Sequence, residues 1–218
     1  MNTTNVQFVG WTAMLGGIIG VIGFICLILL FVVGEPFGSI NDFLSIPTGL
    51  LLLPLVVALY RLHAPQAPLW SGVALVAGIA GFLSTMLGSG LLLLGRIDFQ
   101  QSLVFGIGGF GLVGLWVLLN GVLGLRAATL PIGIAWSGIA LGITPTLALL
   151  AVFRVGSVAS GLSAVAGQTT GFAMNPLLIA LFVLGGLSYA GMPVWFIVVG
   201  RLFAAGRVAV SVGAVAVR

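Results

Sequence analysis

The sequence predicts an all-α fold, a polytopic transmembrane bundle of six helices built with a hairpin pseudo-repeat. Hydrophobic residues make up 61% of the 218 residues and charged residues only 5%, whereas soluble domains carry about 25% charged residues. A bilayer core needs about 20 apolar residues per helix, so this length accommodates six spans joined by short connections. A related stretch also occurs twice, at residues 61–75 and 126–141. Composition, length and repetition together indicate an integral membrane protein.

The whole chain is expected to form one integral membrane domain, residues 1–218, with no room for a separate soluble domain. The first apolar run is too long for the hydrophobic region of a signal peptide, and no basic residue precedes it, so we expect it to remain as a helix. The predicted helices are residues 8–33, 44–60, 69–95, 102–125, 131–153 and 175–200, followed by an interfacial tail at 201–218.

Turn-forming residues and prolines divide these helices. Residues 34–43 contain two acids, a proline and several turn formers, so they predict a loop. Pro47 would then lie in the first turn of the second helix, where a missing N–H costs little, whereas Pro54 and Pro145 lie inside helices and predict kinks. The remaining polar connections are a short turn at 96–101 and a longer Gly, Ser and Ala segment at 154–174.

Each copy of the repeated stretch ends an apolar run with an arginine, turns through a loop that contains proline, and restarts with Trp-Ser-Gly-x-Ala-Leu. Arginine near a helix end is attracted to anionic headgroups, and tryptophan is enriched at the membrane interface. We therefore expect two equivalent turns that anchor the topology, one with Arg61 and Trp70 and one with Arg126 and Trp136. Arg201 begins a fainter third copy, which would divide the helices into three hairpins.

The other tryptophans are expected at different depths. Trp11 and Trp195 fall near the same membrane surface as Trp70, where interfacial aromatic residues are common. Trp136 falls slightly deeper, and Trp116 falls well inside the fourth helix. These positions predict an aromatic belt at one surface and one tryptophan in the interior.

Glycine spacing predicts close packing between helices. Because lipid provides no hydrophobic force between helices, small residues that let backbones approach are favoured at interfaces. One set follows the pattern G-x-G-x-x-G, but a dinucleotide site would also need a preceding strand and a βαβ unit. We therefore interpret both sets as packing faces. They are Gly16, Gly20 and Gly23 in the first helix and Gly106, Gly108 and Gly111 in the fourth.

Charge and cysteine content limit the partners. The formal charge of +4 comes from seven basic residues, all arginine, against three acids. The arginines are scattered over separate loops, so we expect no nucleic-acid partner, because nucleic-acid binding needs a clustered basic face. Cys26 is the only cysteine, which excludes an internal disulfide and indicates a small apolar filler. The expected partners are the lipid bilayer and either another membrane protein or a second copy of the chain.

The sequence contains little that could carry a reaction. His63 is the only histidine, so we expect neither bis-histidine haem ligation nor a histidine-based metal site. Its position in a turn predicts a solvated or headgroup-facing side chain. The chain has no H-E-x-x-H, no P-loop, no G-x-S-x-G and no pair of acids within a predicted span. We therefore expect no catalytic residue, metal or cofactor, and a protein that is not an enzyme.

A set of hydroxyl side chains near the membrane midplane is the one candidate site. No ionisable residue falls clearly within a predicted span, although ion-coupled transporters commonly use such residues. The hydroxyls can bond back to their own helices or across packed interfaces. Alternatively they converge on a small cavity for a neutral solute, where Tyr189 is a donor and Pro145 frees a carbonyl. The candidate residues are Ser84, Thr85, Thr144, Thr146, Ser188 and Tyr189.

The ends of two helices carry a resemblance in layout. Ala58-Leu59-Tyr60 closes the second predicted helix, and Pro193-Val-Trp195-Phe-Ile-Val-Val-Gly-Arg201 closes the sixth. With six helices, this layout resembles small uncharacterised bacterial membrane families classed as domains of unknown function. The resemblance covers most of the chain as a layout and implies no activity and no functional residues. With the all-arginine basic set, it leads us to expect a location in the bacterial inner membrane.

Three functions remain open at this stage. The first is a non-catalytic accessory subunit or partner-binding bundle, which the glycine-rich faces favour. The second is a small transporter or permease for a neutral or lipophilic solute, which Pro54, Pro145 and the midplane hydroxyls favour. An intramembrane enzyme ranks last, because no acid, base or metal site is visible.

The arginines predict that both termini are cytoplasmic. One arginine lies in the loop that starts at Arg61, one in the loop that starts at Arg126, and three in the tail. Five arginines therefore lie on the same side as the termini, and two lie on the other side. The arginine-rich side of a membrane protein faces the cytoplasm. A reporter fused to the C-terminus should therefore report a cytoplasmic location. A periplasmic or extracellular signal would contradict this topology.

Overall fold

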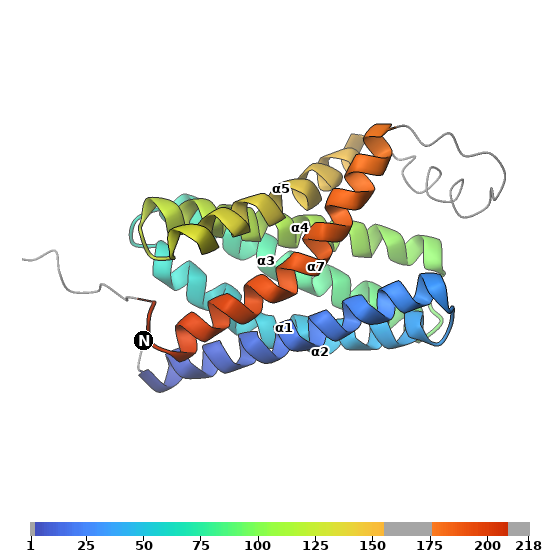
Figure 1. Cartoon of the computed structure of the whole chain (residues 1–218), viewed down its shortest axis with the longest axis horizontal. Helices are drawn as coiled ribbons and strands as arrows, with labels where there is room; N and C mark the ends of the chain where they lie inside the picture. Colours follow the sequence, from blue (N-terminus) through green and yellow to red (C-terminus); the bar gives the residue numbers. More distant parts are fainter. Residues whose placement is uncertain (1–2, 155–175, 209–218) are drawn as a thin grey trace, which may run out of the picture.

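The computed structural model describes residues 3–154 and 176–208 of the chain. This described part is all helical, as the sequence predicts (Figure 1). The helices are α1 (Thr3–Val32), α2 (Phe37–His63), α3 (Pro68–Leu93), α4 (Phe99–Arg126), α5 (Ile132–Arg154) and α7 (Pro176–Ala204). Each contains a stretch that is long and apolar enough to cross a membrane. The six helices indicate a multi-pass membrane protein.

Two helix starts follow directly from local sequence. Asp98 precedes α4 and forms a capping box, in which its carboxylate accepts from the backbone N–H of Gln101 over 2.7 Å. The Gln101 side chain accepts in turn from the backbone N–H of Asp98 over 3.1 Å. Pro68 occupies the first turn of α3, where a missing N–H removes no helical hydrogen bond.

The predicted loop at residues 34–43 is confirmed only for residues 34–36, because α2 begins at Phe37. The Glu35 carboxylate accepts from the backbone N–H of Ser39 over 3.3 Å and from its hydroxyl over 3.1 Å, which supports the first turn. The polar residues taken for a loop are therefore the start of the helix. Pro47 consequently lies inside α2, together with Pro54.

The end of the last helix also differs from its prediction. Helix α7 continues to Ala204, so Arg201 lies in its last turn and does not begin the tail. Phe203 is buried in the core and holds this final turn against the bundle. The connection at 155–175 and the tail at 209–218 lie outside the described residues.

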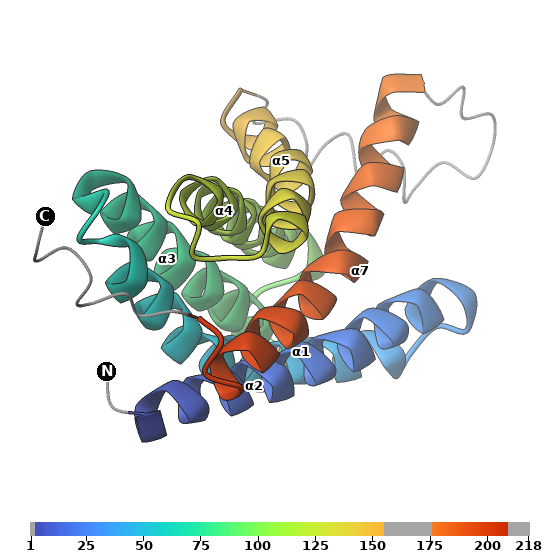
Figure 2. The same cartoon turned by 60° about the vertical axis from the view of Figure 1, so that its left-hand side comes forward.

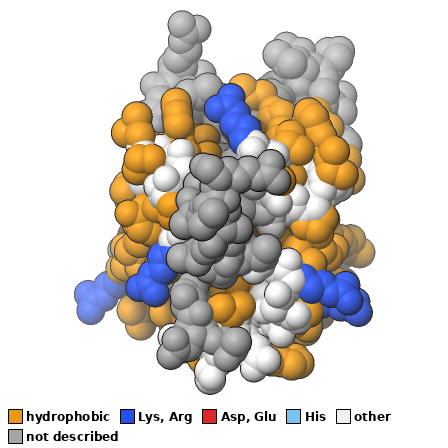
Figure 3. All heavy atoms as spheres, turned by 90° about the vertical axis from the view of Figure 1, so that its left-hand side faces the viewer, with side chains coloured by type: hydrophobic (Ala, Val, Ile, Leu, Met, Phe, Trp, Pro, Cys, Tyr) orange, Lys and Arg blue, Asp and Glu red, His pale blue; other side chains and the backbone are white. Residues whose placement is uncertain are grey.

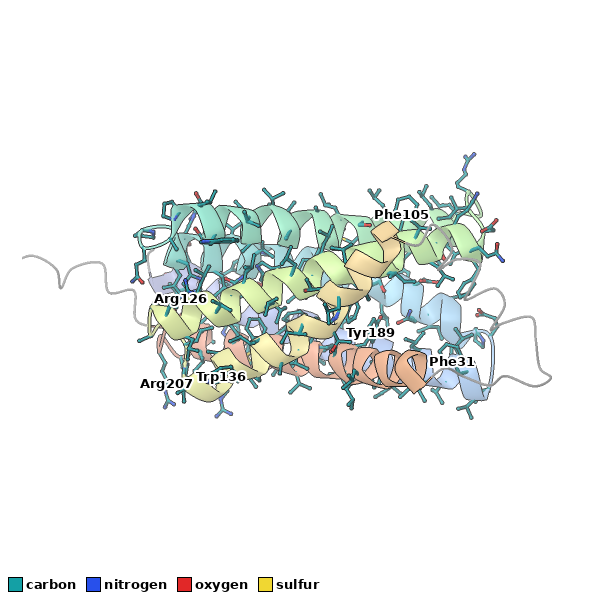
Figure 4. The ribbon with its side chains drawn as sticks, turned by 90° about the horizontal axis from the view of Figure 1, so that it is seen from above. Phe31, Phe105, Arg126, Trp136, Tyr189 and Arg207 are labelled. Atoms are coloured by element: carbon teal, nitrogen blue, oxygen red, sulfur yellow. The ribbon has the colours of Figure 1, made fainter. Side chains whose placement is uncertain are left out.

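The helices form a ring in chain order. Each helix packs against the next, and α7 closes the ring by packing along α1, while the contact between α5 and α7 is the least extensive in the ring. Figures 2 and 4 show that α5 and α7 diverge toward the end of α5 and the start of α7. Figure 1 shows that α7 bends along its length. Pro193 lies inside α7, and a proline within a helix is a common cause of such a bend.

Glycines hold the neighbouring helices at backbone contact. A β-carbon added at Gly81 of α3 would lie 2.8 Å from the backbone nitrogen of Val113 in α4. One added at Gly142 of α5 would lie 2.5 Å from the carbonyl oxygen of Gly114 in α4. On the other side of the ring, one added at Gly10 of α1 would overlap the backbone of α7 at Ala204. Larger residues at these points would push the helices apart.

Only part of the predicted glycine faces takes part in this packing. In α1, Gly16 faces Leu52 of α2, and Gly20 faces Pro193 of α7, as predicted. In α4, Gly111 packs against Leu149 of α5, but β-carbons added at the two preceding glycines of the string, Gly106 and Gly108, would meet nothing within 4 Å. Cys26 is buried, as expected for a small filler.

Four aromatic side chains fill the centre of the ring, and we refer to them as the aromatic plug. They are Phe82 of α3, Trp116 of α4, and Trp195 and Phe196 of α7. The Trp116 ring lies 5.7 Å from that of Phe82, 6.2 Å from that of Trp195 and 5.9 Å from that of Phe196. These contacts cross the ring from α3 and α4 to α7. The interior is therefore packed at the level of the plug.

The two ends of the bundle differ in charge. Arg61, Arg126, Arg201 and Arg207 lie at the end where α1 begins, which we call the arginine end. Two acids, Glu35 and Asp98, and two arginines, Arg96 and Arg154, lie near the opposite end. Figure 4 shows Arg126 and Arg207 at one end and Phe31 and Phe105 at the other. Figure 3 views the arginine end directly and shows separate basic side chains and no visible acidic side chain. This is the asymmetry on which the topology prediction depends.

The glycine contacts predict a clear difference between packed and open positions. Gly81→Ala and Gly142→Ala should each lower the unfolding temperature in detergent, because overpacking costs about 1–3 kcal/mol. Gly72→Ala is the matched control, since a β-carbon there would meet nothing within 4 Å. It should leave the unfolding temperature unchanged or raise it slightly. Equal effects at all three positions would contradict the packing described.

Candidate functional site

The candidate hydroxyls on α3 lie at the interface with α4. The Ser84 hydroxyl donates to the carbonyl oxygen of Phe105 over 3.0 Å, which links the two helices. The Thr85 hydroxyl donates to the carbonyl oxygen of Phe82 in its own helix over 2.9 Å. A β-carbon added at Gly109 of α4 would lie 2.7 Å from the Thr85 methyl carbon. Both side chains thus serve the contact between α3 and α4.

The candidate hydroxyls on α5 flank Pro145. The Thr146 hydroxyl donates to the carbonyl oxygen of Gly142 over 2.6 Å, within the same helix, and the Thr144 side chain is half-buried. Pro145 packs against Gly114 of α4. Because proline has no N–H, the carbonyl of Leu141 loses its usual helical partner.

The candidate residues on α7 lie against aromatic side chains of other helices. Ser188 is buried. The Tyr189 ring lies 5.9 Å from that of Phe24 in α1 and 5.0 Å from that of Phe110 in α4. Figure 4 shows Tyr189 between the end marked by Trp136 and the end marked by Phe31. No hydrogen bond between described residues connects one group of hydroxyls to another, and their convergence on one cavity stays a prediction.

Sequence reasoning missed a carboxylate within a span. Asp42 lies in the second turn of α2, where its half-buried carboxylate accepts from the hydroxyl of Ser89 in α3 over 2.9 Å. Its neighbour Asn41 faces α1, since a β-carbon added at Gly23 would lie 3.4 Å from the Asn41 amide oxygen. These two residues fasten the start of α2 to the helices on both sides. A prediction that began α2 at Phe37 would have placed both residues within the helix.

The prediction of an exposed His63 was wrong, because the side chain is only 1% exposed. It lies at the end of α2 and forms what we call the histidine latch with Asn120 of α4 and Thr129 of the turn before α5. Its Nδ1 lies 3.2 Å from the Asn120 amide oxygen, and its Nε2 lies 2.9 Å from the Thr129 hydroxyl. The latch therefore joins α2 to α4 and to a turn that lies far from His63 in the sequence.

The hydrogen bonds of the latch fix the roles of its atoms. The Asn120 side-chain nitrogen donates to the carbonyl oxygen of Trp116 over 2.8 Å, so its oxygen faces His63 as an acceptor. An imidazole with its hydrogen on Nδ1 satisfies both remaining bonds, because Nδ1 donates to Asn120 and Nε2 accepts from Thr129. Among the described residues, no buried side-chain nitrogen or oxygen is left without a partner.

Two open grooves lie on the perimeter of the bundle. The first, which we call the α5–α7 seam, has a volume of about 410 Å³. The second, the α1–α2 groove, has a volume of about 450 Å³. The seam is lined by Ile134, Ser137, Leu141, Gly191, Val194, Trp195 and Val198.

Trp195 was predicted at the membrane interface, but it is only 3% exposed and lines the α5–α7 seam from within. Its indole N–H donates to the carbonyl oxygen of Ile134 over 2.9 Å. Gly138 of α5 packs against the same indole, since an added β-carbon would lie 3.1 Å from its nitrogen. The side chain thus connects the seam to the aromatic plug.

The residues expected to anchor the topology lie at the surface. Arg61, Trp70, Arg126, Trp136 and Arg201 are all exposed. The two repeated turns differ in other positions, however, because Ser71 is buried and Ser137 is exposed. Their equivalence as a structural repeat stays a prediction.

No protein-family model, curated protein or solved structure matches the sequence. Among the described residues, no group of three or more His, Cys, Asp or Glu side chains could hold a metal ion. The function must therefore be inferred from the grooves, the packing and the polar contacts of this chain.

The latch predicts a coupling between two distant residues. Asn120→Leu should destabilise the protein by about 1–3 kcal/mol, because it leaves a buried ring nitrogen of His63 without a partner. In a double-mutant cycle, His63→Leu together with Asn120→Leu should cost less than the sum of the two single changes.

The measurement for this cycle is equilibrium unfolding in detergent. Ser45→Ala is the control, because the Ser45 hydroxyl bonds back to the Asn41 carbonyl oxygen of its own helix, and it should have little effect. Additive effects of His63→Leu and Asn120→Leu would contradict the latch.

Proposed function

We propose that the chain is a non-catalytic membrane protein that binds one transmembrane helix of a membrane-protein partner in the α5–α7 seam. The observation that carries this proposal is the contrast between a filled interior and an open seam. The aromatic plug blocks the centre of the ring, and the seam lies where two neighbouring helices meet least.

The chemistry of the seam suits a helix. Its lining side chains are almost all apolar, and the one indole N–H within it already donates to Ile134. The seam therefore offers no free donor from Trp195 to attract a polar ligand. An apolar helix could fill it through van der Waals contact, which is a major source of helix association in lipid.

Small residues line the accessible face of α5 beside the seam. Gly133, Ser137 and Ala140 are exposed, with spacings of four and three residues that keep them on one face. A β-carbon added at Gly133 would meet nothing within 4 Å, whereas one at Gly138 would press on Trp195. Gly138 is therefore needed for packing within the fold, whereas Gly133 is not. A partner backbone approaching α5 would account for the small exposed residues.

The location of the protein belongs to the same proposal. We place it in the bacterial inner membrane, with the arginine end in the cytoplasm. The support is the distribution of arginines over the two ends and the exposed Trp70 and Trp136 close to the arginine end, which matches the positive-inside rule and the aromatic belt.

A permease for a neutral or lipophilic solute is the second candidate. Pro145 and Pro193 lie inside the two helices that border the seam, and prolines within membrane helices are common near the binding sites of transporters. Movement of α5 against α7 would open a path beside Tyr189. In that case, Thr144→Val combined with Tyr189→Phe would reduce solute uptake into proteoliposomes, whereas a partner-binding protein would show no uptake to reduce.

Site-specific photo-crosslinking tests the proposed partner. A photoreactive phenylalanine analogue replacing Ser137 or Val194, both in the seam, should give one discrete protein adduct in native membranes. The same analogue at Val76 of α3 is the matched control, because this side chain is 67% exposed but lies away from the seam. It should give no such adduct.

Three results would count against the partner helix. Adducts with lipid alone would show that the seam faces the bilayer. An adduct of twice the chain's mass would identify the occupant as a second copy. Identical patterns from the seam positions and from Val76 would show that the seam has no special affinity.

A further inference from the structure

The α1–α2 groove differs from the seam because it combines apolar walls with polar groups at one end. Its lining includes Leu50, Leu53 and Val57 of α2 and Phe8 of α1, which is 62% exposed. The same groove also contains Asn5 and Arg61. Both of these residues lie at the arginine end, since α1 begins at Thr3 and α2 ends at His63.

Three features of this end attract an anion. The Arg61 side chain is exposed, and its guanidinium offers several N–H donors that suit a phosphate. The Asn5 amide lies in the first turn of α1 and offers N–H donors. The first four backbone N–H groups of a helix also have no partner within the helix, and together they favour an anion at its N-terminus.

The length of the groove matches one half of a bilayer. From Leu50 to Arg61 is eleven residues, which at 1.5 Å per residue gives roughly 16 Å along α2. One leaflet contributes about 15 Å of hydrocarbon, half of the 30 Å core. An acyl chain whose headgroup lies at Arg61 would therefore extend along the groove to about Leu50.

We infer that the α1–α2 groove is a binding site for one anionic phospholipid of the leaflet at the arginine end. One acyl chain lies between Phe8 and the α2 residues Leu53 and Val57. The phosphate is bound by Arg61 and by donors at the start of α1. This site is separate from the α5–α7 seam and does not depend on the proposed partner.

The groove favours a lipid over the other occupants. A free phosphate would leave the apolar walls exposed, and a partner helix would bring an apolar surface to a groove that ends in a positive charge. An anionic phospholipid satisfies both parts of the groove at once. Basic pockets between transmembrane helices on the cytoplasmic side are known to select such headgroups.

Native mass spectrometry of the full chain in detergent tests the site, with dioleoyl phosphatidylglycerol as the probe and dioleoyl phosphatidylcholine as the comparison. The wild-type protein should retain one phosphatidylglycerol at least ten times more strongly than phosphatidylcholine. Arg61→Gln should abolish this preference. Val57→Trp, which fills the groove, should reduce the binding of both lipids.

Arg126→Gln is the matched control, because Arg126 is also an exposed arginine in the last turn of a helix at the same end. It should keep the preference for phosphatidylglycerol. Equal losses from Arg61→Gln and Arg126→Gln would show only a general attraction to positive charge and would overturn the site. Equal binding of the two lipids by the wild-type protein, or binding of inorganic phosphate as strong as that of phosphatidylglycerol, would overturn it as well. Because Arg61 is exposed, its variant should fold, so the result does not depend on Val57→Trp.

Discussion

Close approach of backbones at glycines is the constraint on which the rest of this bundle depends. Gly81, Gly142 and Gly10 each bring a helix into contact with the backbone of a neighbour. In lipid, such contacts replace the hydrophobic force that would hold helices together in water. They set the distances at which the side chains of the aromatic plug can meet across the ring. Trp195 of α7 packs against Gly138 of α5, but the two helices do not stay this close along their whole length. The seam between them is therefore open.

The polar contacts depend on the same distances. Asp42 reaches Ser89 only because α2 and α3 lie side by side, and the histidine latch forms only if α2, α4 and the turn before α5 stay in register. Buried polar groups are costly when they lose a partner. The latch therefore makes one arrangement of these three elements more favourable than its alternatives, and the packed glycines make that arrangement accessible.

The sequence predicted the helices well because apolar runs of membrane length have few alternatives. It failed where a residue's partner lies far away in the chain. Asn41 and Asp42 resembled loop residues because their contacts with α1 and α3 are not visible locally. His63 was expected at the surface because Asn120 and Thr129 lie 57 and 66 positions further along the chain. Trp195 was assigned to the interface from its depth alone, but rotation about the helix axis decides whether a side chain faces lipid or the interior.

The central claim is that the ring is packed at the aromatic plug, which leaves the perimeter as the proposed place for binding. Cysteine accessibility in proteoliposomes tests this claim most directly, using Val117→Cys in a chain in which Cys26 has been replaced by alanine. Val117 is fully buried in the core, so the new thiol should not react with a water-soluble maleimide added to either side, whereas a cysteine at Arg126 should react. Rapid labelling of the thiol at position 117 would reveal a water-filled interior and contradict the account.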